Sequence, residues 1–237
     1  MKGGERMEKN VSYWNLVKNP GNEKEADLYI YSEIESDKKW IFGEISSDTS
    51  AESFRQKLSE MNDIDKINIY INSKGGDVFE GIGIYSQLKR HKAKKVVHID
   101  ALAASISSVI AMAGDEVIMG ECANMMIHPV WAAVAGNAKT LREQADVLDK
   151  LTESVKNAYR SRCGEKLSEE KLNEFMSGDE TWLSAEECIR YGLADRTTAE
   201  QEKDPEPDNG GTPEPSPKNH TTSFADKAIG IIGNYFM

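Results

Sequence analysis

The chain has few cysteines and no long apolar run. Its three cysteines, Cys122, Cys163 and Cys188, are odd in number and lack the paired spacing of metal ligands, so we expect neither a disulfide framework nor a cysteine-based metal site. No run of 18 apolar residues occurs, and the N-terminal residues lack the apolar core of a secretion signal. These absences predict a cytoplasmic protein whose thiols stay reduced.

Basic residues are scarce relative to acidic ones. The 29 lysines and arginines face 40 aspartates and glutamates, which gives a formal charge of −11, and no basic cluster occurs. A nucleic acid or an anionic membrane is therefore not an expected partner. No glycine-rich loop of the kind that holds phosphates is present, and we expect no nucleotide, metal or other cofactor.

The length of 237 residues, 39% of them hydrophobic, supports one substantial domain with tails. We expect an N-terminal arm over residues 1–24 and a folded domain over residues 25–196. Residues 197–223 hold most of the prolines and many acidic residues, which predicts a disordered linker. The final apolar segment, residues 224–237, suits a short interaction helix and is too short to span a membrane.

An apolar island, Tyr13–Val17, interrupts the polar arm. It is predicted to form an edge strand of the domain, or else a contact with a neighbouring subunit. Two β-rich runs follow at residues 27–34 and 40–45, and Ser36–Lys39 between them is predicted to form a hairpin turn. Together these two runs should open the sheet.

The centre of the chain alternates strands with helices, which predicts an α/β fold. Repeated βα units imply parallel strands with right-handed crossovers and functional residues at the carboxyl ends of the strands. A long amphipathic helix is expected over residues 139–162, and the capping box Ser184–Glu187 should open a last helix that stops at Gly192. The other expected elements are strands at 67–71, 95–99, 116–119 and 125–127 and helices at 50–61, 78–91, 105–113 and 168–176.

Ser105 lies among small residues where a predicted strand ends and a predicted helix begins. The N-terminus of a helix offers unpaired N–H groups and a partial positive charge, which stabilise a developing oxyanion. Ser105 is therefore a candidate nucleophile. Ordinary α/β packing also produces a small-residue turn that enters an apolar helix, so this stretch alone leaves both interpretations open.

A serine nucleophile needs a base, an acid that orients the base, and N–H donors for the oxyanion. His128 follows an apolar strand 23 residues after Ser105 and is the candidate base, although a histidine in such a place is commonly structural. The Gly75-Gly76 turn also ends a strand and lets a backbone N–H approach a substrate carbonyl, although an ordinary turn looks the same.

Four motifs resemble, in order and approximate spacing, those of the Clp protease proteolytic subunit family: Ile71–Asp77, Ala103–Ser105, Met126–Pro129 and Trp182–Leu193. The resemblance covers roughly residues 27–195. It implies the ClpP/crotonase-like α/β fold of repeated β-β-α units, with a protruding handle helix and a disordered C-terminal tail.

The phage branch of this family, the Clp-like head maturation proteases, is a closer match. The segments that are similar to this branch are Trp14–Lys18, Gly75–Phe79, Leu102–Ser105, Val109–Asp115 and Glu180–Trp182.

The resemblance assigns roles residue by residue. It implies Ser105 as nucleophile and His128 as general base and then general acid. The backbone N–H groups of Gly76 and Ile106 would form the oxyanion hole.

The third triad position falls on Glu180, where housekeeping Clp subunits have aspartate, and the neighbouring Asp179 is the alternative acid. Lys74 replaces a proline of those subunits. Residues 131–134 replace a Gly-Gly segment along which a substrate peptide would pair through its main chain. The implied substrate-binding residues are Gly75, Asp77, Val78, Pro129, Val130 and Trp131.

The resemblance implies a serine endopeptidase that works without ATP or a cofactor and cleaves scaffold and capsid proteins within a phage procapsid in the host cytoplasm. Residues 139–163 resemble the handle helix through which rings pack, which implies a homo-oligomer such as a heptameric ring. The alternatives are a cellular Clp proteolytic subunit that works with an ATPase unfoldase, a crotonase-type acyl-CoA enzyme and a catalytically silent scaffold.

Overall fold

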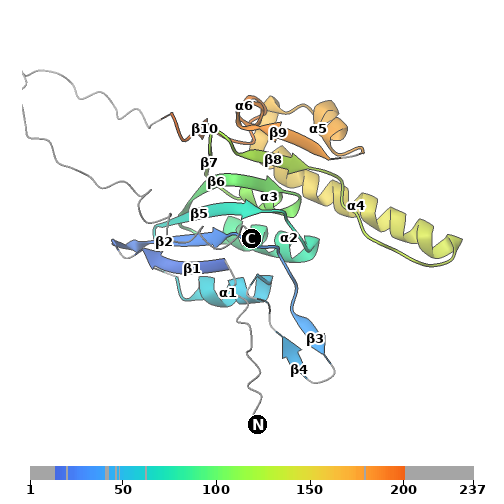
Figure 1. Cartoon of the computed structure of the whole chain (residues 1–237), viewed down its shortest axis with the longest axis horizontal. Coiled ribbons are helices and arrows are strands. Elements are labelled where there is room, and N and C mark those ends of the chain that lie inside the picture. The colour runs from blue at the N-terminus through green and yellow to red at the C-terminus, as the bar shows by residue number, and fades with distance from the viewer. Residues whose placement is uncertain are drawn as a thin grey trace, which may run out of the picture. The chain divides into compact units, whose positions relative to one another are not determined.

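The protein is seen here in a computed structural model that describes residues 14–19, 21–40, 43–45, 47, 49–61, 63–178 and 180–200 (Figure 1). These residues belong to one compact unit, Met1–Gln201. The predicted linker from residue 201 onward and the C-terminal apolar segment lie outside the described residues, as do the first 13 residues of the predicted arm. None of the helices in these ranges combines the length and apolar character that a membrane span requires.

An eight-stranded mixed sheet forms the centre of this unit. Its main path runs β1-β2-β5-β6-β7-β10, and β8 pairs with both β6 and β9. All pairs are parallel except β1–β2 and β8–β9, so the α/β fold expected from the sequence is confirmed. The strands are β1 (Trp14–Asn19), β2 (Asn22–Ile30), β5 (Lys66–Ser73), β6 (Lys94–Ala104), β7 (Glu116–Met119), β8 (Asn124–Ile127), β9 (Thr181–Ser184) and β10 (Arg196–Thr197).

Side-chain caps mark the start of several helices. Ser50 accepts a hydrogen bond from the Ser53 backbone N–H, and Ser184 and Glu187 form the predicted capping box. α4 begins after Asn137, and Figure 1 shows its N-terminal end extending away from the sheet. The helices are α1 (Ala51–Ser59), α2 (Val78–Arg90), α3 (Ile106–Ala111), α4 (Ala138–Cys163), α5 (Glu169–Phe175) and α6 (Ala185–Arg190), and a 3₁₀ turn covers Gly164–Lys166.

The core is made by aliphatic side chains of the central strands packed against α1, α2 and α3. In β5 the isoleucines at 67, 69 and 71 are all fully buried. They meet Phe54, Ile84 and Ile110 in one continuous cluster. Burying each such side chain stabilises the fold by about 1.5–3 kcal/mol. The carboxyl ends of the strands are thus held on a rigid base.

The apolar island, apart from Tyr13, which lies outside the described residues, forms the edge strand that the sequence predicted, because β1 pairs antiparallel with β2. The hairpin prediction was wrong. Among the described residues, 40 and 43–45 do not pair with 27–34, because β2 already has β1 and β5 as its two neighbours. A separate two-stranded ribbon forms instead between β3 (Lys38–Trp40) and β4 (Gly43–Ile45).

β6 is longer than the predicted strand 95–99 and changes partner along its length. Val96–Ile99 pairs with β7, whereas Leu102–Ala104 pairs with β8. The change follows the end of β7 at Met119. As a result, the end of β8 lies beside the end of β6, where Ser105 begins the next turn.

Candidate active site

Ser105 occupies the turn between β6 and α3 in a strained backbone conformation. β6 ends at Ala104 and α3 begins at Ile106. With φ 55° and ψ −129°, Ser105 has the only positive φ among the non-glycine residues in the described ranges. Such a conformation costs on the order of 1–3 kcal/mol and persists where surrounding contacts enforce it, as at nucleophiles set on sharp strand-to-helix turns.

Hydrogen bonds on both sides hold this turn. The Ser105 N–H donates to the Met126 carbonyl of β8 at 2.9 Å. The Ser108 hydroxyl donates to the Ser105 carbonyl at 2.5 Å and lies 2.7 Å from the Tyr159 hydroxyl on α4. Burial raises the pKa of Tyr159, so its phenol stays a neutral hydrogen-bonding group.

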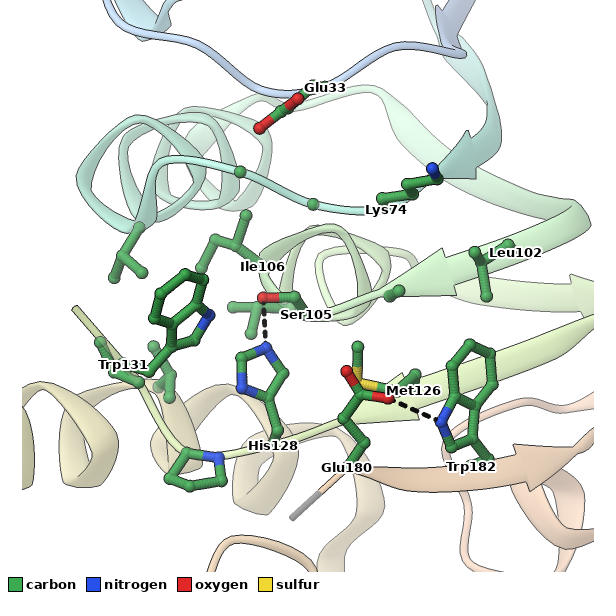
Figure 2. A pocket seen from close by; sticks show the side chains of 18 of the residues that line it. Glu33, Lys74, Leu102, Ser105, Ile106, Met126, His128, Trp131, Glu180 and Trp182 are labelled. Carbon is green, nitrogen blue, oxygen red and sulfur yellow. Dashed lines mark hydrogen bonds between the residues drawn. The ribbon is translucent and has the colours of Figure 1, made fainter. Parts of the chain in front are cut away.

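His128 follows β8 and reaches the serine. Its Nε2 lies 2.8 Å from Ser105 Oγ, as Figure 2 shows. The neighbouring Val130 N–H donates to Thr152 Oγ1 on α4 at 3.0 Å, which fixes the chain just after the histidine. The predicted nucleophile and base are therefore within hydrogen-bond reach of each other.

The glycine turn packs directly against the serine turn. Gly75 and Gly76 have φ of 97° and 144°, values that favour glycine. A Cβ atom on Gly75 would lie 2.8 Å from Ser105 Cβ and 3.1 Å from the Ile106 nitrogen, so only glycine fits this approach. The Gly76 and Ile106 N–H groups donate to no acceptor within the described part of the chain. Both predicted oxyanion donors are thus unpaired.

Strand pairing brings Glu180 to the histidine. In the antiparallel β8–β9 ladder, Ile127 lies opposite Thr181. One residue further along, the same register places Glu180 opposite His128. Residues in opposite positions have Cβ atoms about 4.5–5.5 Å apart. Asp179, the alternative acid, lies outside the described residues.

The Glu180 carboxylate forms no hydrogen bond with the imidazole in this structure. Its Oε2 accepts a hydrogen bond from Trp182 Nε1 at 3.0 Å. His128 Nδ1 has no hydrogen-bond partner among the residues that the structure describes, and Figure 2 draws this nitrogen on the side of the ring away from Glu180. The serine and histidine are paired, whereas the carboxylate of the candidate acid is bound to Trp182.

A cavity of about 1120 Å³ opens beside these residues. Its inner wall is apolar and made of buried and half-buried side chains, while its outer rim carries two exposed indoles, Trp131 (71% exposed) and Trp182 (54% exposed). This is a suitable site for an extended chain with an apolar side chain directed inward. The apolar wall is formed by Val78, Leu102, Ile106, Val109, Met126, Val130 and Val155.

Most of the predicted substrate-binding residues line this cavity. They are Gly75, Val78, Pro129, Val130 and Trp131. The structure places Asp77 in another role, because its carboxylate accepts from the Phe79 and Glu80 N–H groups and caps α2.

Glu33, Tyr159 and Trp182 are among the lining residues that the sequence did not single out as site residues. Glu33 reaches the rim because Ile34 bridges to Gly76, a long-range contact without a local signal. In the sequence, Tyr159 is only one of the residues in the apolar stripe of a predicted long helix. Trp182 is visible in the sequence only as part of a motif.

Within the described ranges, no group of three His, Cys, Asp or Glu side chains is arranged to hold a metal ion.

A serine held in a strained strand-to-helix turn against a histidine, beside unpaired N–H groups on a parallel sheet, is the arrangement used by hydrolases with a serine nucleophile. The Clp protease family model matches residues 22–201. The chain therefore belongs to the Clp protease family.

Curated relatives agree with this assignment. The ATP-dependent Clp protease proteolytic subunit of Deinococcus radiodurans is 32% identical over 177 residues, which cover 73% of this chain and 85% of the relative. The ATP-dependent Clp protease proteolytic subunit 1 of Prochlorococcus marinus subsp. pastoris is 31% identical over 188 residues, which cover 76% of this chain and 92% of the relative.

Proposed function

We propose that this protein is a serine endopeptidase that cleaves polypeptides through an acyl-enzyme. The observation that carries the proposal is the 2.8 Å contact between Ser105 Oγ and His128 Nε2 in a member of the Clp protease family. A hydroxyl at this distance can pass its proton to the imidazole as it attacks.

In the proposed reaction, Ser105 Oγ attacks the peptide carbonyl carbon and its proton moves to His128 Nε2. The Gly76 and Ile106 N–H groups stabilise the oxyanion that forms. When the C–N bond breaks, His128 returns the proton to the departing amine. A water molecule then attacks the ester carbonyl and loses a proton to His128. His128 passes this proton to Ser105 Oγ as the acyl C–O bond breaks, which releases the acid product and restores the free serine.

We assign Glu180 as the residue that orients His128 during this reaction, because the strand register places the two opposite each other. Glu180→Gln should lower kcat by up to about 10⁴-fold, the cost of losing the acid of such a triad. Asp179→Asn is the matched comparison and should leave kcat close to the parent value. If Asp179→Asn lowered kcat strongly and Glu180→Gln did not, Asp179 would be the residue that orients His128.

The proposed biological role is ATP-independent cleavage of scaffold and capsid proteins during phage head maturation, in the host cytoplasm. Similarity of five segments to the phage branch supports this role. Val130 and the exposed Trp131 line the cavity, and residues 132–138 after them are exposed, so a flexible substrate segment could pair there without prior unfolding. We also propose that the acidic stretch predicted over 197–223 serves, beyond β10, as a linker between the protease domain and the final apolar segment.

A cellular role is the second candidate, because the relatives named above are described as ATP-dependent subunits. Adding a Clp ATPase and ATP separates the two candidates. If turnover of a folded substrate rises only with the ATPase, the cellular role is correct. If flexible scaffold protein is cleaved equally well without it, the phage role stands.

We propose that the protein acts as a homo-oligomer. The N-terminal half of α4 is exposed and carries apolar side chains that have no partner within the described chain, among them Leu141 and Val147. A helix with such a stripe is suited to packing against another copy. Light scattering should show a multimer, and Leu141→Glu should shift it toward smaller species.

The activity itself is tested with a fluorogenic apolar peptide. Ser105→Ala should lower kcat by at least about 10³-fold. Ser86→Ala, which changes a serine of α2 outside the cavity, is the matched control and should keep the parent rate. A Ser105→Ala variant with the parent rate would remove Ser105 from the mechanism.

A further inference from the structure

The peptide unit that carries the Gly76 N–H is held by the backbone of Ile34, a few residues after β2. The Ile34 N–H donates to the Gly75 carbonyl at 2.8 Å, and the Asp77 N–H donates to the Ile34 carbonyl at 2.8 Å. In a planar trans peptide the N–H points opposite to the C=O, and the described residues contain no cis peptide bond. The Gly76 N–H is therefore directed away from Ile34, and Gly76 itself lines the cavity.

This peptide unit needs support from its neighbours because the residues on both sides of it are glycines. Gly75 and Gly76 carry no Cβ that would resist rotation of the unit between them, and glycine reaches more backbone conformations than any other residue. Turning the unit over would break the bond to Ile34 and direct the Gly76 N–H away from the position of the oxyanion. Hydrogen bonds to adjacent segments therefore have to fix its orientation.

The Ser73 side chain links the glycine turn to the segment that contains Ile34. Ser73 is the last residue of β5, is 4% exposed, and pairs with Ala103 of β6. Its Oγ accepts a hydrogen bond from the Gly75 N–H at 3.1 Å and donates one to the Ser32 carbonyl at 2.7 Å. One buried hydroxyl thus binds both the start of the glycine turn and the chain two residues before Ile34.

We propose that Ser73 is a positioning residue that sets the oxyanion hole by fixing the orientation of the Gly76 N–H. The inference rests on the proposed serine protease mechanism. Ser73 is not among the residues that line the cavity, so it acts through the glycine turn and not on the substrate. Without its hydroxyl, the buried Gly75 N–H loses its acceptor, and rotation of the neighbouring peptide unit is no longer opposed from this side.

Ser73→Ala tests the proposal, because it removes one oxygen atom and leaves the strand intact. With a fluorogenic apolar peptide, kcat should fall about 10- to 100-fold, somewhat less than the roughly 10²–10³-fold cost of losing an oxyanion donor completely. KM should stay nearly unchanged, because the donor acts on the transition state and not on the bound substrate. A peptide aldehyde, which forms a hemiacetal with the serine and places its oxygen among the same donors, should bind more weakly by a similar factor.

Ser50→Ala is the matched control. Ser50 is 1% exposed, and its Oγ accepts from the Ser53 backbone N–H at 3.1 Å, but it caps α1 and does not line the cavity. Both variants therefore lose a buried hydroxyl that accepts from a backbone N–H, and both should lose stability in urea unfolding. Only Ser73→Ala should lose kcat and aldehyde affinity.

Hydrogen exchange followed by mass spectrometry completes the test without turnover. In Ser73→Ala, exchange should become faster in the peptides that contain the Gly75 and Ile34 N–H groups and stay at the parent rate in α1. Parent kcat, a rise in KM alone, or faster exchange throughout the domain would overturn the positioning role while Ser105→Ala remains inactive. If Ser105→Ala were active, the proposed protease mechanism would fail instead, so the two failures are distinguishable.

Discussion

The hydroxyl groups of Ser108 and Tyr159 share a 2.7 Å hydrogen bond in the core behind the candidate nucleophile. Ser108 donates its own proton to the Ser105 carbonyl, so Tyr159 is the donor in this pair. α4 is thereby tied to the strained turn through two short bonds. The helix that carries exposed apolar residues at one end also supports the site at its other end.

Tyr159→Phe should lower the free energy of unfolding by about 1–2 kcal/mol, because it leaves the buried Ser108 oxygen without its donor. The measurement is urea unfolding followed by circular dichroism. Tyr85→Phe is the control: Tyr85 is half-buried, and the change should stay within about 0.5 kcal/mol. Equal losses in the two variants would show that the Ser108 bond contributes nothing.

Gly75→Ala should abolish most activity. A Cβ atom at this position would lie 2.7 Å from the Ala104 carbonyl oxygen and 2.8 Å from Ser105 Cβ, so the serine turn must move. A displacement of about 1 Å at a reacting group costs about 10²-fold in rate.

The control for Gly75 is Gly164→Ala. Gly164 also has a positive φ of 54°, but a Cβ atom there would meet nothing within 4 Å. It should cost about 1–2 kcal/mol of stability through backbone strain alone and leave kcat unchanged. The prediction fails if the two variants lose activity equally.

His98 stacks on Tyr70 with ring centroids 4.8 Å apart on the exposed face of the sheet. Partial burial lowers the pKa of His98, and nearby Lys66 and Arg196 lower it further, although Asp100 and Glu116 act in the opposite direction. Its pKa in the folded protein therefore lies below the ordinary value of 6.5.

This shift fixes the sign of a pH effect. At pH values near and below 6.5, residue 98 is protonated more in the unfolded chain than in the folded chain. The free energy of unfolding therefore decreases as the pH falls below about 6.5. Unfolding measured at pH 7.5 and at pH 5.5 should show a larger loss for the parent than for His98→Gln. Identical pH dependence in the two proteins would contradict the assignment.

The three cysteines should differ sharply in reactivity. Cys122 is exposed, whereas burial raises the pKa of Cys163 to about 11 and that of Cys188 to about 12. Since the thiolate is the reactive form, a thiol reagent at pH 8 should modify one cysteine quickly and the other two only after unfolding. Rapid modification of two or three thiols in the folded protein would show that the core opens.

Local signals predicted most of the elements, whereas the central pair of the site was predicted by the resemblance of several motifs to the Clp protease family. The capping box at Ser184 and the apolar stripe of α4 depend on residues that lie close together in the sequence, and the structure confirms both elements. Ser105 and His128 each end a strand, and parallel pairing alone brings such ends together.

The features that the sequence did not reveal depend on long-range pairing. β6 continues beyond Ile99 through a small-residue run of weak strand propensity, because β8 supplies a second partner there. The Ile34–Gly76 bridge, which brings Glu33 to the rim, has no counterpart in local sequence. The hydrogen-bond partner of Glu180 could not be predicted from the spacing of residues, because it depends on how the side chains lie.

The most direct measurement of the central claim is covalent labelling with a fluorophosphonate, followed by peptide mass spectrometry. The contact between Ser105 Oγ and His128 Nε2 predicts one adduct on the peptide that contains residue 105, and none in Ser105→Ala. His128→Ala should reduce the labelling rate strongly, since the serine then lacks its base. Labelling of Ser105→Ala to the same extent as the parent, or an adduct on another serine, would contradict the account.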